Sequence, residues 1–243
     1  IILASRFGHL SVVEALLGAG AQTEAAGEGG YTALNLASYG GHQGVVEALL
    51  RAGAQVEAAG EDGYTALMNA SINGEQGVVE ALLSRGAQTE AATGDGTNSL
   101  LAASKYGHIE VVRLLLAGGA DVNATNKNGR TSLVESAALG HEGVVRLLIE
   151  AGADTAATDD KGVTAIKAAS VAHGEEFVAI LHLLQQATDR ATASLPHKCA
   201  ACGVVSSGAK FKKCARCQGV RYCSKECQHD HWKQHKPDCA RGG

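Results

Sequence analysis

The apolar residues of the first 187 positions follow a pattern that returns every 33 residues. Val45-Val46 and Leu49-Leu50 show the pattern best, because apolar side chains four positions apart lie on one face of a helix. Further valine pairs keep the same spacing at 12–13, 78–79, 111–112 and 144–145, and Phe177-Val178 takes the equivalent position in the last period. The pattern predicts one amphipathic helix in every period.

A shorter helix is predicted before the amphipathic one. In the period that starts at Gly30, Leu34 and Ala37 are three positions apart and face the same side of a helix. Each short helix follows a residue whose side chain can accept a hydrogen bond from the first backbone N–H groups: Thr32, Thr65, Asn98, Thr131 and Thr164. A glycine, which adopts a left-handed conformation at least cost, ends each second helix: Gly20, Gly53, Gly86, Gly119 and Gly152.

This unit of a hairpin and two helices resembles the ankyrin repeat. The resemblance covers residues 1–187 and implies an all-α repeat solenoid of six units: 1–29, 30–62, 63–95, 96–128, 129–161 and 162–187. The first unit lacks its hairpin, so we expect the natural protein to begin further upstream. The family's Thr-Pro-Leu-His signature is changed in every unit, as in Thr32-Ala-Leu-Asn35. We therefore expect every unit to lack the proline that pre-sets the helix start and the histidine that links neighbouring repeats.

The resemblance also implies a partner-binding concave face, formed by hairpin tips and by variable residues of the first helices. These positions are Tyr31, Tyr64, Thr97, Arg130 and Val163, and the pairs Arg6-Phe7, Tyr39-Gly40, Ile72-Asn73, Lys105-Tyr106 and Ala138-Leu139. Tyrosine and arginine are enriched at interface hot spots. We therefore expect a protein-binding groove that contains Tyr31, Tyr39, Tyr64, Tyr106 and Arg130. The alternative is that the tyrosines were copied with the repeats and have no binding role.

Four histidines recur at multiples of the repeat length, each after a glycine: His9, His42, His108 and His141. Stacked helices are about 10 Å apart, which is too far for histidines of different repeats to share one metal. We expect them to be structural residues at the start of the second helices.

Composition and charge separate the end of the chain from the repeats. The chain has 243 residues, and its glycine content is nearly twice that of an average protein. All 7 cysteines lie in its last 45 residues. An odd number of cysteines in paired spacings favours metal ligation in a reducing compartment, so we expect an intracellular protein of the cytoplasm or nucleus.

Residues 1–195 hold 11 Lys and Arg against 22 Asp and Glu, whereas residues 196–243 hold 10 against 3. Two domains joined by a short linker at 188–197 are predicted. The apolar runs are shorter than the roughly 18 residues of a membrane span, so no membrane association is expected.

The cysteines and one histidine form four closely spaced pairs: Cys199 with Cys202, Cys214 with Cys217, Cys223 with Cys227, and His235 with Cys239. Eight thiolate or imidazole ligands suffice for two tetrahedral zinc sites without an open position, so both zinc ions would be structural. About 40 residues cannot bury a sufficient hydrophobic core, and zinc must supply folding free energy. Spacing alone allows either sequential or interleaved pairing, and His229 or His231 could compete with His235.

The complete ligand string, with Arg221-Tyr222-Cys223 and His231-Trp232, is similar to the MYND-type zinc finger over residues 199–239. The resemblance implies interleaved pairing, with one zinc on Cys199, Cys202, Cys223 and Cys227 and the other on Cys214, Cys217, His235 and Cys239. It also implies that the finger docks a proline-containing peptide on Ser224, Gln228 and Trp232. The alternative role for Trp232 is packing against the zinc loops.

These features predict a zinc-binding protein–protein interaction scaffold, monomeric and not an enzyme. The ankyrin groove would hold one partner, and the finger would hold a proline-containing peptide of another. One alternative is the regulatory or targeting part of a larger enzyme, such as a methyltransferase, whose catalytic domain lies upstream. Another is nucleic-acid binding by the basic finger, which is disfavoured because its basic residues are scattered and only Phe211, Tyr222 and Trp232 could stack on bases.

Overall fold

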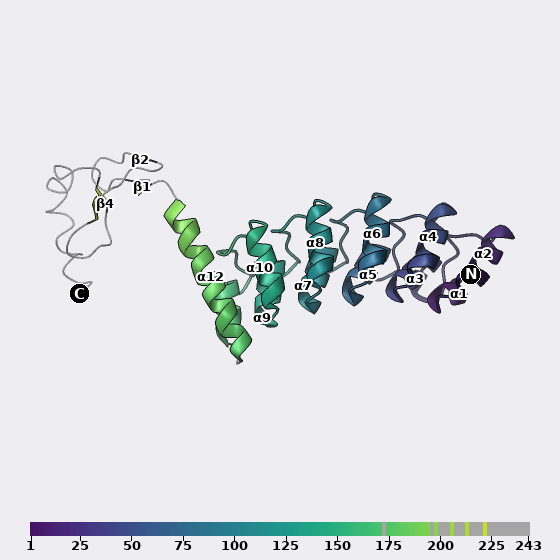
Figure 1. The fold of residues 1–243 in the computed structure, drawn as a ribbon, viewed down its shortest axis with the longest axis horizontal. Helices are drawn as coiled ribbons and strands as arrows, with labels where there is room; N and C mark the ends of the chain where they lie inside the picture. Colours follow the sequence, from purple (N-terminus) through teal and green to yellow (C-terminus); the bar gives the residue numbers. More distant parts are fainter. Residues whose placement is uncertain (172–173, 195–196, 199–204, 207–211, 214–220, 223–243) are drawn as a thin grey trace. The chain divides into compact units, whose positions relative to one another are not determined.

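The computed structural model describes residues 1–171, 174–194, 197–198, 205–206, 212–213 and 221–222. The chain divides into two compact units, Ile1–Ala187 and Thr188–Gly243. The first is a stack of helix pairs, as the 33-residue period predicts (Figure 1).

The helix pairs follow the repeats in order. They are α1 (Ile2–Arg6) and α2 (Leu10–Gly18), α3 (Ala33–Tyr39) and α4 (Gln43–Arg51), α5 (Ala66–Asn73) and α6 (Gln76–Ser84), α7 (Ser99–Tyr106) and α8 (Ile109–Ala117), α9 (Ser132–Ala138) and α10 (Glu142–Glu150), and α11 (Ala165–Val171) and α12 (Glu175–Ser194). A single 3-10 turn, η1 (Glu28–Gly30), precedes α3. The first helices of the pairs, α1 to α11, contact one another in one row, and the second helices α2 to α10 contact one another in a parallel row.

The predicted helix starts and ends are confirmed. The side chains of all five predicted N-cap residues accept a hydrogen bond from a backbone N–H group three positions later, at 3.4 Å for Thr32, 3.3 Å for Thr65 and Thr131, 2.9 Å for Asn98 and 3.2 Å for Thr164. The five glycines that follow the second helices all have positive φ, from 82° at Gly86 to 90° at Gly119. The local signals in each repeat therefore set the helix bounds.

The apolar stripe of the second helices packs with buried residues of the first helices to form the core of the stack. Val45, Val46 and Leu49 are at most 1% exposed, and so are their equivalents one repeat later, Val78, Val79 and Leu82. Full burial of a leucine or valine side chain stabilises a fold by about 1.5–3 kcal/mol. The same contact is repeated between neighbouring units, so each unit depends on its neighbours for stability.

Helix α12 is 20 residues long and extends beyond the repeat region. Residues 188–194, predicted as part of the linker, are instead its last turns. Gln185-Gln186 stands where the earlier units have a helix-ending glycine, and the alanines that follow favour helix, so nothing in the local sequence stops it there.

Beyond the end of α12, the described part of the second unit consists of two short antiparallel pairs of strands. β1 (His197–Lys198) pairs with β2 (Val205–Ser206), and β3 (Lys212–Lys213) pairs with β4 (Arg221–Tyr222). A search of the described helices finds none that is long and apolar enough to cross a membrane.

Candidate functional site

The hairpins between repeats form a bonded row along one side of the stack. Within the hairpin of the third unit, the Gly60 N–H group donates to the Tyr64 carbonyl at 3.1 Å. Backbone N–H groups also join successive hairpins: Glu61 donates to the Gly29 carbonyl at 2.8 Å, Lys127 to Asp95 at 2.9 Å and Asp160 to Asn128 at 3.0 Å. These bonds join the second hairpin to the third, the fourth to the fifth and the fifth to the sixth.

A surface hollow of about 260 Å³ lies between the hairpins and the first helices of the third to fifth units. Its walls combine aromatic, acidic and amide side chains. The lining residues are Tyr64, Ile72, Asp95, Thr97, Leu101, Ala102, Lys105, Tyr106, Asn126, Asn128 and Glu135. Tyr64 and Tyr106, both predicted as groove residues, therefore come together from different repeats.

Two titratable groups of the hollow, Asp95 and Tyr64, have pKa values shifted from their ordinary ranges. The Oδ1 atom of Asp95 accepts hydrogen bonds from the Thr93 hydroxyl and from the Thr97 N–H group, the latter at 3.1 Å, and these bonds lower the pKa of Asp95. Burial raises the pKa of Tyr64, with further contributions from the negative charges of Asp95 and Asp62. At neutral pH the hollow therefore presents a carboxylate beside a protonated phenol.

Tyr31 holds the equivalent position one repeat before Tyr64 but has a different environment. Its hydroxyl donates to the Asp62 carboxylate of the next hairpin, and burial together with this bond raises the pKa of Tyr31 to about 12. The ring lies over Gly60, where a Cβ atom would be 2.7 Å from Tyr31 Cε1. The residue equivalent to Gly60 in the next unit is Thr93, so a ring of Tyr64 in the same place would meet that side chain.

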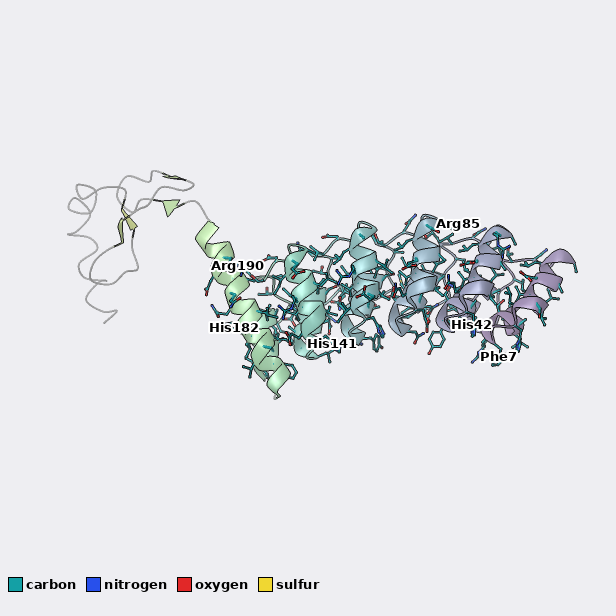
Figure 2. The ribbon with its side chains drawn as sticks, viewed as in Figure 1. Phe7, His42, Arg85, His141, His182 and Arg190 are labelled. Carbon is teal, nitrogen blue, oxygen red and sulfur yellow. The ribbon has the colours of Figure 1, made fainter. Side chains whose placement is uncertain are left out.

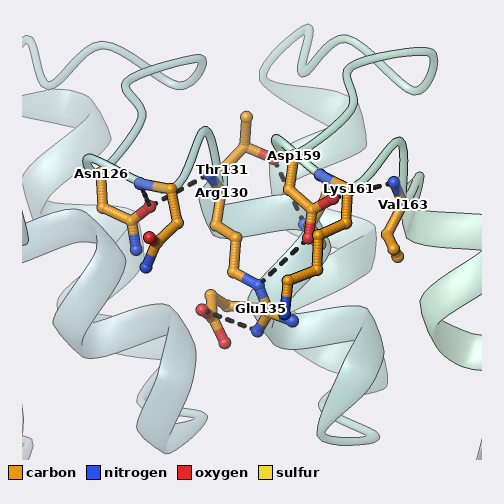
Figure 3. A network of polar contacts seen from close by, with 9 residues as sticks. Asn126, Arg130, Thr131, Glu135, Asp159, Lys161 and Val163 are labelled. Atoms are coloured by element: carbon orange, nitrogen blue, oxygen red, sulfur yellow. Dashed lines mark hydrogen bonds and ion pairs between the residues drawn. The ribbon is translucent and has the colours of Figure 1, made fainter.

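Arg130, also predicted as a groove residue, is held by an ion-pair network (Figure 3). Its Nη1 atom lies 3.1 Å from Glu135 Oε1, and its Nε atom lies 3.5 Å from Asp159 Oδ2 in the next hairpin. The Oδ1 atom of Asp159 accepts the backbone N–H groups of Val163 and Lys161, both at 2.9 Å. The Val163 bond contributes most to a lowered pKa of Asp159. The network links two hairpins and helix α9.

Tyr39, the last predicted groove residue, lies at the end of α3 and is 58% exposed. It does not line the hollow. The five predicted residues thus divide into two that share the hollow, Tyr64 and Tyr106, two that are tied to neighbouring repeats, Tyr31 and Arg130, and one exposed helix end.

Three of the four repeated histidines are structural, as expected. The Nε2 atoms of His42, His108 and His141 lie 3.0, 2.8 and 2.9 Å from the backbone oxygens of Arg6, Ile72 and Lys105, each in the preceding unit. Figure 2 shows His42 and His141 on one long edge of the repeat stack, with Arg85 on the opposite edge.

Asn35 stands where the family signature has a histidine, and its side chain makes a hydrogen bond within its own unit. The Asn35 side chain donates from Nδ2 to the carbonyl of Ala58 at 2.9 Å. Ala58 lies near the end of the same unit. The hydrogen bond thereby ties α3 to the loop that leads to the next hairpin.

Sequence reasoning missed several residues of the hollow, above all Asp95, Glu135, Asn126 and Asn128. A signal was present, because Asp62, Asp95, Asn128 and Lys161 occupy one hairpin position and vary in charge. The signal could not show which of these positions border the same hollow.

The predicted zinc ligands lie outside the described residues: Cys199, Cys202, Cys214, Cys217, Cys223, Cys227, His235 and Cys239. So do the predicted peptide-binding residues Ser224, Gln228 and Trp232. Seven thiols and one imidazole are nevertheless a donor set that fits zinc.

Comparison with known protein families agrees with both modules. A family model described as ankyrin repeats in three copies matches residues 1–93 and 99–191. A second model, described as a MYND finger, matches residues 199–239. The chain therefore belongs to the ankyrin-repeat family, and its repeats are followed by a MYND zinc finger. Both modules mediate protein interactions, and the finger binds zinc.

Two curated relatives share short segments with the chain. SET domain-containing protein 14 of Caenorhabditis elegans is 49% identical over 35 residues, which is 14% of this chain and 8% of the relative. Ubiquitin C-terminal hydrolase 15 of Oryza sativa subsp. japonica is 48% identical over 44 residues, which is 18% of this chain and 4% of the relative. The chain thus covers less than a tenth of either relative.

Proposed function

We propose that this chain is a monomeric scaffold that binds one protein in the groove of its ankyrin repeats and a second protein through its MYND finger. The hollow that Tyr64 and Tyr106 share is the observation that carries the groove. Tyrosine combines a large apolar ring with a hydroxyl and is enriched among the residues that dominate binding energy.

The bonds between neighbouring hairpins on one side of the hollow support this role. The hairpin that carries Asp95 is bonded to the next one through the Lys127 N–H group, and Arg130 ties the next hairpin to Asp159. A surface ordered before binding loses less conformational entropy when the partner arrives. The hairpin row therefore favours recognition by a preformed groove.

Affinity purification with quantitative mass spectrometry tests the groove. The double substitution Tyr64→Ala/Tyr106→Ala should deplete at least one partner about tenfold, whereas Tyr39→Ala, an exposed tyrosine outside the hollow, should not. Unchanged recovery of every partner with the double variant would refute the groove.

For the finger, we propose two structural zinc ions with interleaved ligands and a peptide site on Ser224, Gln228 and Trp232. The support is the donor set of seven cysteines and one histidine in four pairs within a matched MYND finger. Metal analysis of protein purified without chelator should give two zinc ions per chain. Trp232→Ala should leave this zinc content unchanged and weaken binding of proline-containing peptides.

We further propose that the chain acts by binding and not by catalysis. Its three well-placed histidines, His42, His108 and His141, direct Nε2 at backbone carbonyls, which supports structural roles. The alternative remains a regulatory part of a larger enzyme, and the names of the two relatives favour it, since one refers to a SET domain and the other to a ubiquitin hydrolase. Sequencing the full transcript would decide between them, because a catalytic domain in the same reading frame supports the alternative.

A further inference from the structure

We propose that the ankyrin groove recognises a basic segment of its partner, and that the hollow beside Tyr64 and Asp95 receives a lysine or arginine side chain of that segment. This inference rests on the proposed function, because it names the kind of partner that the same groove binds.

The charge of the hairpins supports a basic partner. The hairpins of the second to fourth units carry four exposed carboxylates, from Glu28, Glu61, Asp62 and Asp95, and their residues 28–31, 61–64 and 94–97 include no lysine or arginine. Over residues 1–95 the chain has 11 Asp and Glu against 3 Lys and Arg. A surface with one sign of charge attracts and orients a segment of the opposite sign.

The lining of the hollow offers the two kinds of group that bind a cation. The rings of Tyr64 and Tyr106 have electron-rich faces, which attract ammonium and guanidinium groups. Asp95 supplies a full negative charge, and the Thr93 hydroxyl and the Thr97 N–H group both donate to its Oδ1 atom, which holds the carboxylate in place at the hollow. Glu135, the second carboxylate of the hollow, is already paired with Arg130, so Asp95 is the principal anion.

The protein's own Lys105 already uses one of these rings. Its ammonium nitrogen lies 5.7 Å from the ring centroid of Tyr106, and Lys105 also lines the hollow. The contact shows that a cation can lie over this ring, which belongs to a half-exposed side chain. It also makes Lys105 a competitor, because its charge repels an incoming lysine or arginine and must move aside.

The experiment selects peptides and does not require the natural partner to be identified. A phage-displayed library of random peptides is panned on the full chain, and the strongest binder is labelled for fluorescence anisotropy. We expect the selected peptides to be enriched in lysine and arginine. Their affinity should fall as salt rises, because exposed charges are screened.

Substitutions then locate the binding of the selected peptide. Tyr64→Ala and Asp95→Asn should each weaken it by about 3- to 30-fold, and Tyr64→Phe, which keeps the ring, should restore most of the affinity. Lys105→Ala should tighten binding by removing the competing charge. Tyr39→Ala is the control, because this exposed tyrosine lies outside the hollow. Thermal unfolding of each variant verifies that it is folded.

Three results would overturn the inference in different ways. Selected peptides that depend on Tyr64 but lack lysine and arginine would refute the basic partner and leave the groove intact. Basic peptides that bind Tyr64→Ala and Asp95→Asn as well as the unmodified chain would refute the hollow as the cation site. A selection that yields no peptide sensitive to any groove substitution would refute both this inference and the proposed groove.

Discussion

The Nε2 atom of His108 lies 2.8 Å from the backbone oxygen of Ile72 in the preceding repeat. His42 and His141 make the same contact in their own repeats, whereas the equivalent residue of the third unit is Glu75, whose carboxylate has no N–H group to donate. There the Tyr39 carbonyl accepts instead from Asn73 Nδ2 at 2.9 Å. One carbonyl at the end of each first helix, from α1 to α7, is therefore bound by the following unit.

The histidine contact predicts a measurable loss of stability. His108→Ala should lower the free energy of unfolding by about 1 kcal/mol, the usual net value of one hydrogen bond. His9→Ala is the matched control, since His9 is exposed and no hydrogen bond of its side chain is found among the described residues; it should change stability by less than about 0.5 kcal/mol. Urea unfolding followed by circular dichroism measures both, and equal losses would contradict the prediction.

The glycines that lie against these histidine rings predict a difference in the stability cost of glycine-to-alanine substitutions. A Cβ atom on Gly107 would lie 2.7 Å from His141 Nδ1, and Gly107 has φ of 77°. Gly86 has a similar φ of 82°, but a Cβ atom there would have no heavy atom of another residue within 4 Å. Gly86→Ala should therefore cost only the left-handed backbone penalty of about 1–2 kcal/mol, and Gly107→Ala should cost more.

A double substitution isolates the steric part of the stability cost of Gly107→Ala. In a His141→Ala background, Gly107→Ala should cost about as much as Gly86→Ala, because the ring that the methyl group meets is gone. If Gly107→Ala still costs more stability than Gly86→Ala in this background, the cause of the difference is not the histidine ring.

The repeat pattern was sufficient to predict the helix pairs, their caps and their terminal glycines, because these depend on residues within one unit. It did not separate Tyr31 from Tyr64, because their different environments depend on Gly60 and Thr93 in the following hairpins. It likewise predicted Arg130 as a binding residue. The pattern could not show that Arg130 is paired with Asp159, because this ion pair joins side chains of different hairpins. The local sequence therefore determines the repeats, and contacts between repeats determine which side chains remain available.

Tyr31 allows a direct test of this dependence. Gly60→Ala would place a methyl group against the Tyr31 ring and move its hydroxyl away from Asp62. The pKa of Tyr31 should then fall from about 12 toward the ordinary value of about 10. Ultraviolet titration of tyrosinate measures the shift, with Tyr31→Phe identifying its signal. Titration that is unchanged by Gly60→Ala would contradict the proposed role of the glycine.

Asp159 predicts a pH dependence of stability. Backbone N–H groups of Val163 and Lys161, together with Arg130, lower its pKa in the folded chain. Its contribution is therefore fully present above the unfolded-state pKa of about 3.9 and is lost as the pH falls through the lower folded-state pKa. Asp159→Asn should reduce stability at pH 7 and lessen the further loss on acidification. Urea unfolding at neutral and acidic pH measures this. If the unmodified chain and Asp159→Asn lose the same free energy of unfolding on acidification, the prediction fails.

Two buried serines predict a gain of stability. The Ser99 and Ser132 hydroxyls are buried, and no hydrogen-bond partner for either is found among the described residues. Their equivalents in other units are Ala33, Ala66 and Ala165, each at most 1% exposed. Ser99→Ala and Ser132→Ala should each stabilise the chain by about 1 kcal/mol, because an unsatisfied hydroxyl is costly to bury. Lower melting temperatures for both variants would contradict this account.

Tandem affinity purification tests the central claim most directly, because a scaffold must hold two partners at once. One tag is placed on a partner lost with Tyr64→Ala/Tyr106→Ala, and a second tag on a partner lost with Trp232→Ala. Sequential purification through both tags should recover this chain with both partners, and either set of substitutions should abolish the recovery. Partners that never co-purify through both tags, or a single partner lost with both sets of substitutions, would contradict a scaffold with two separate binding modules.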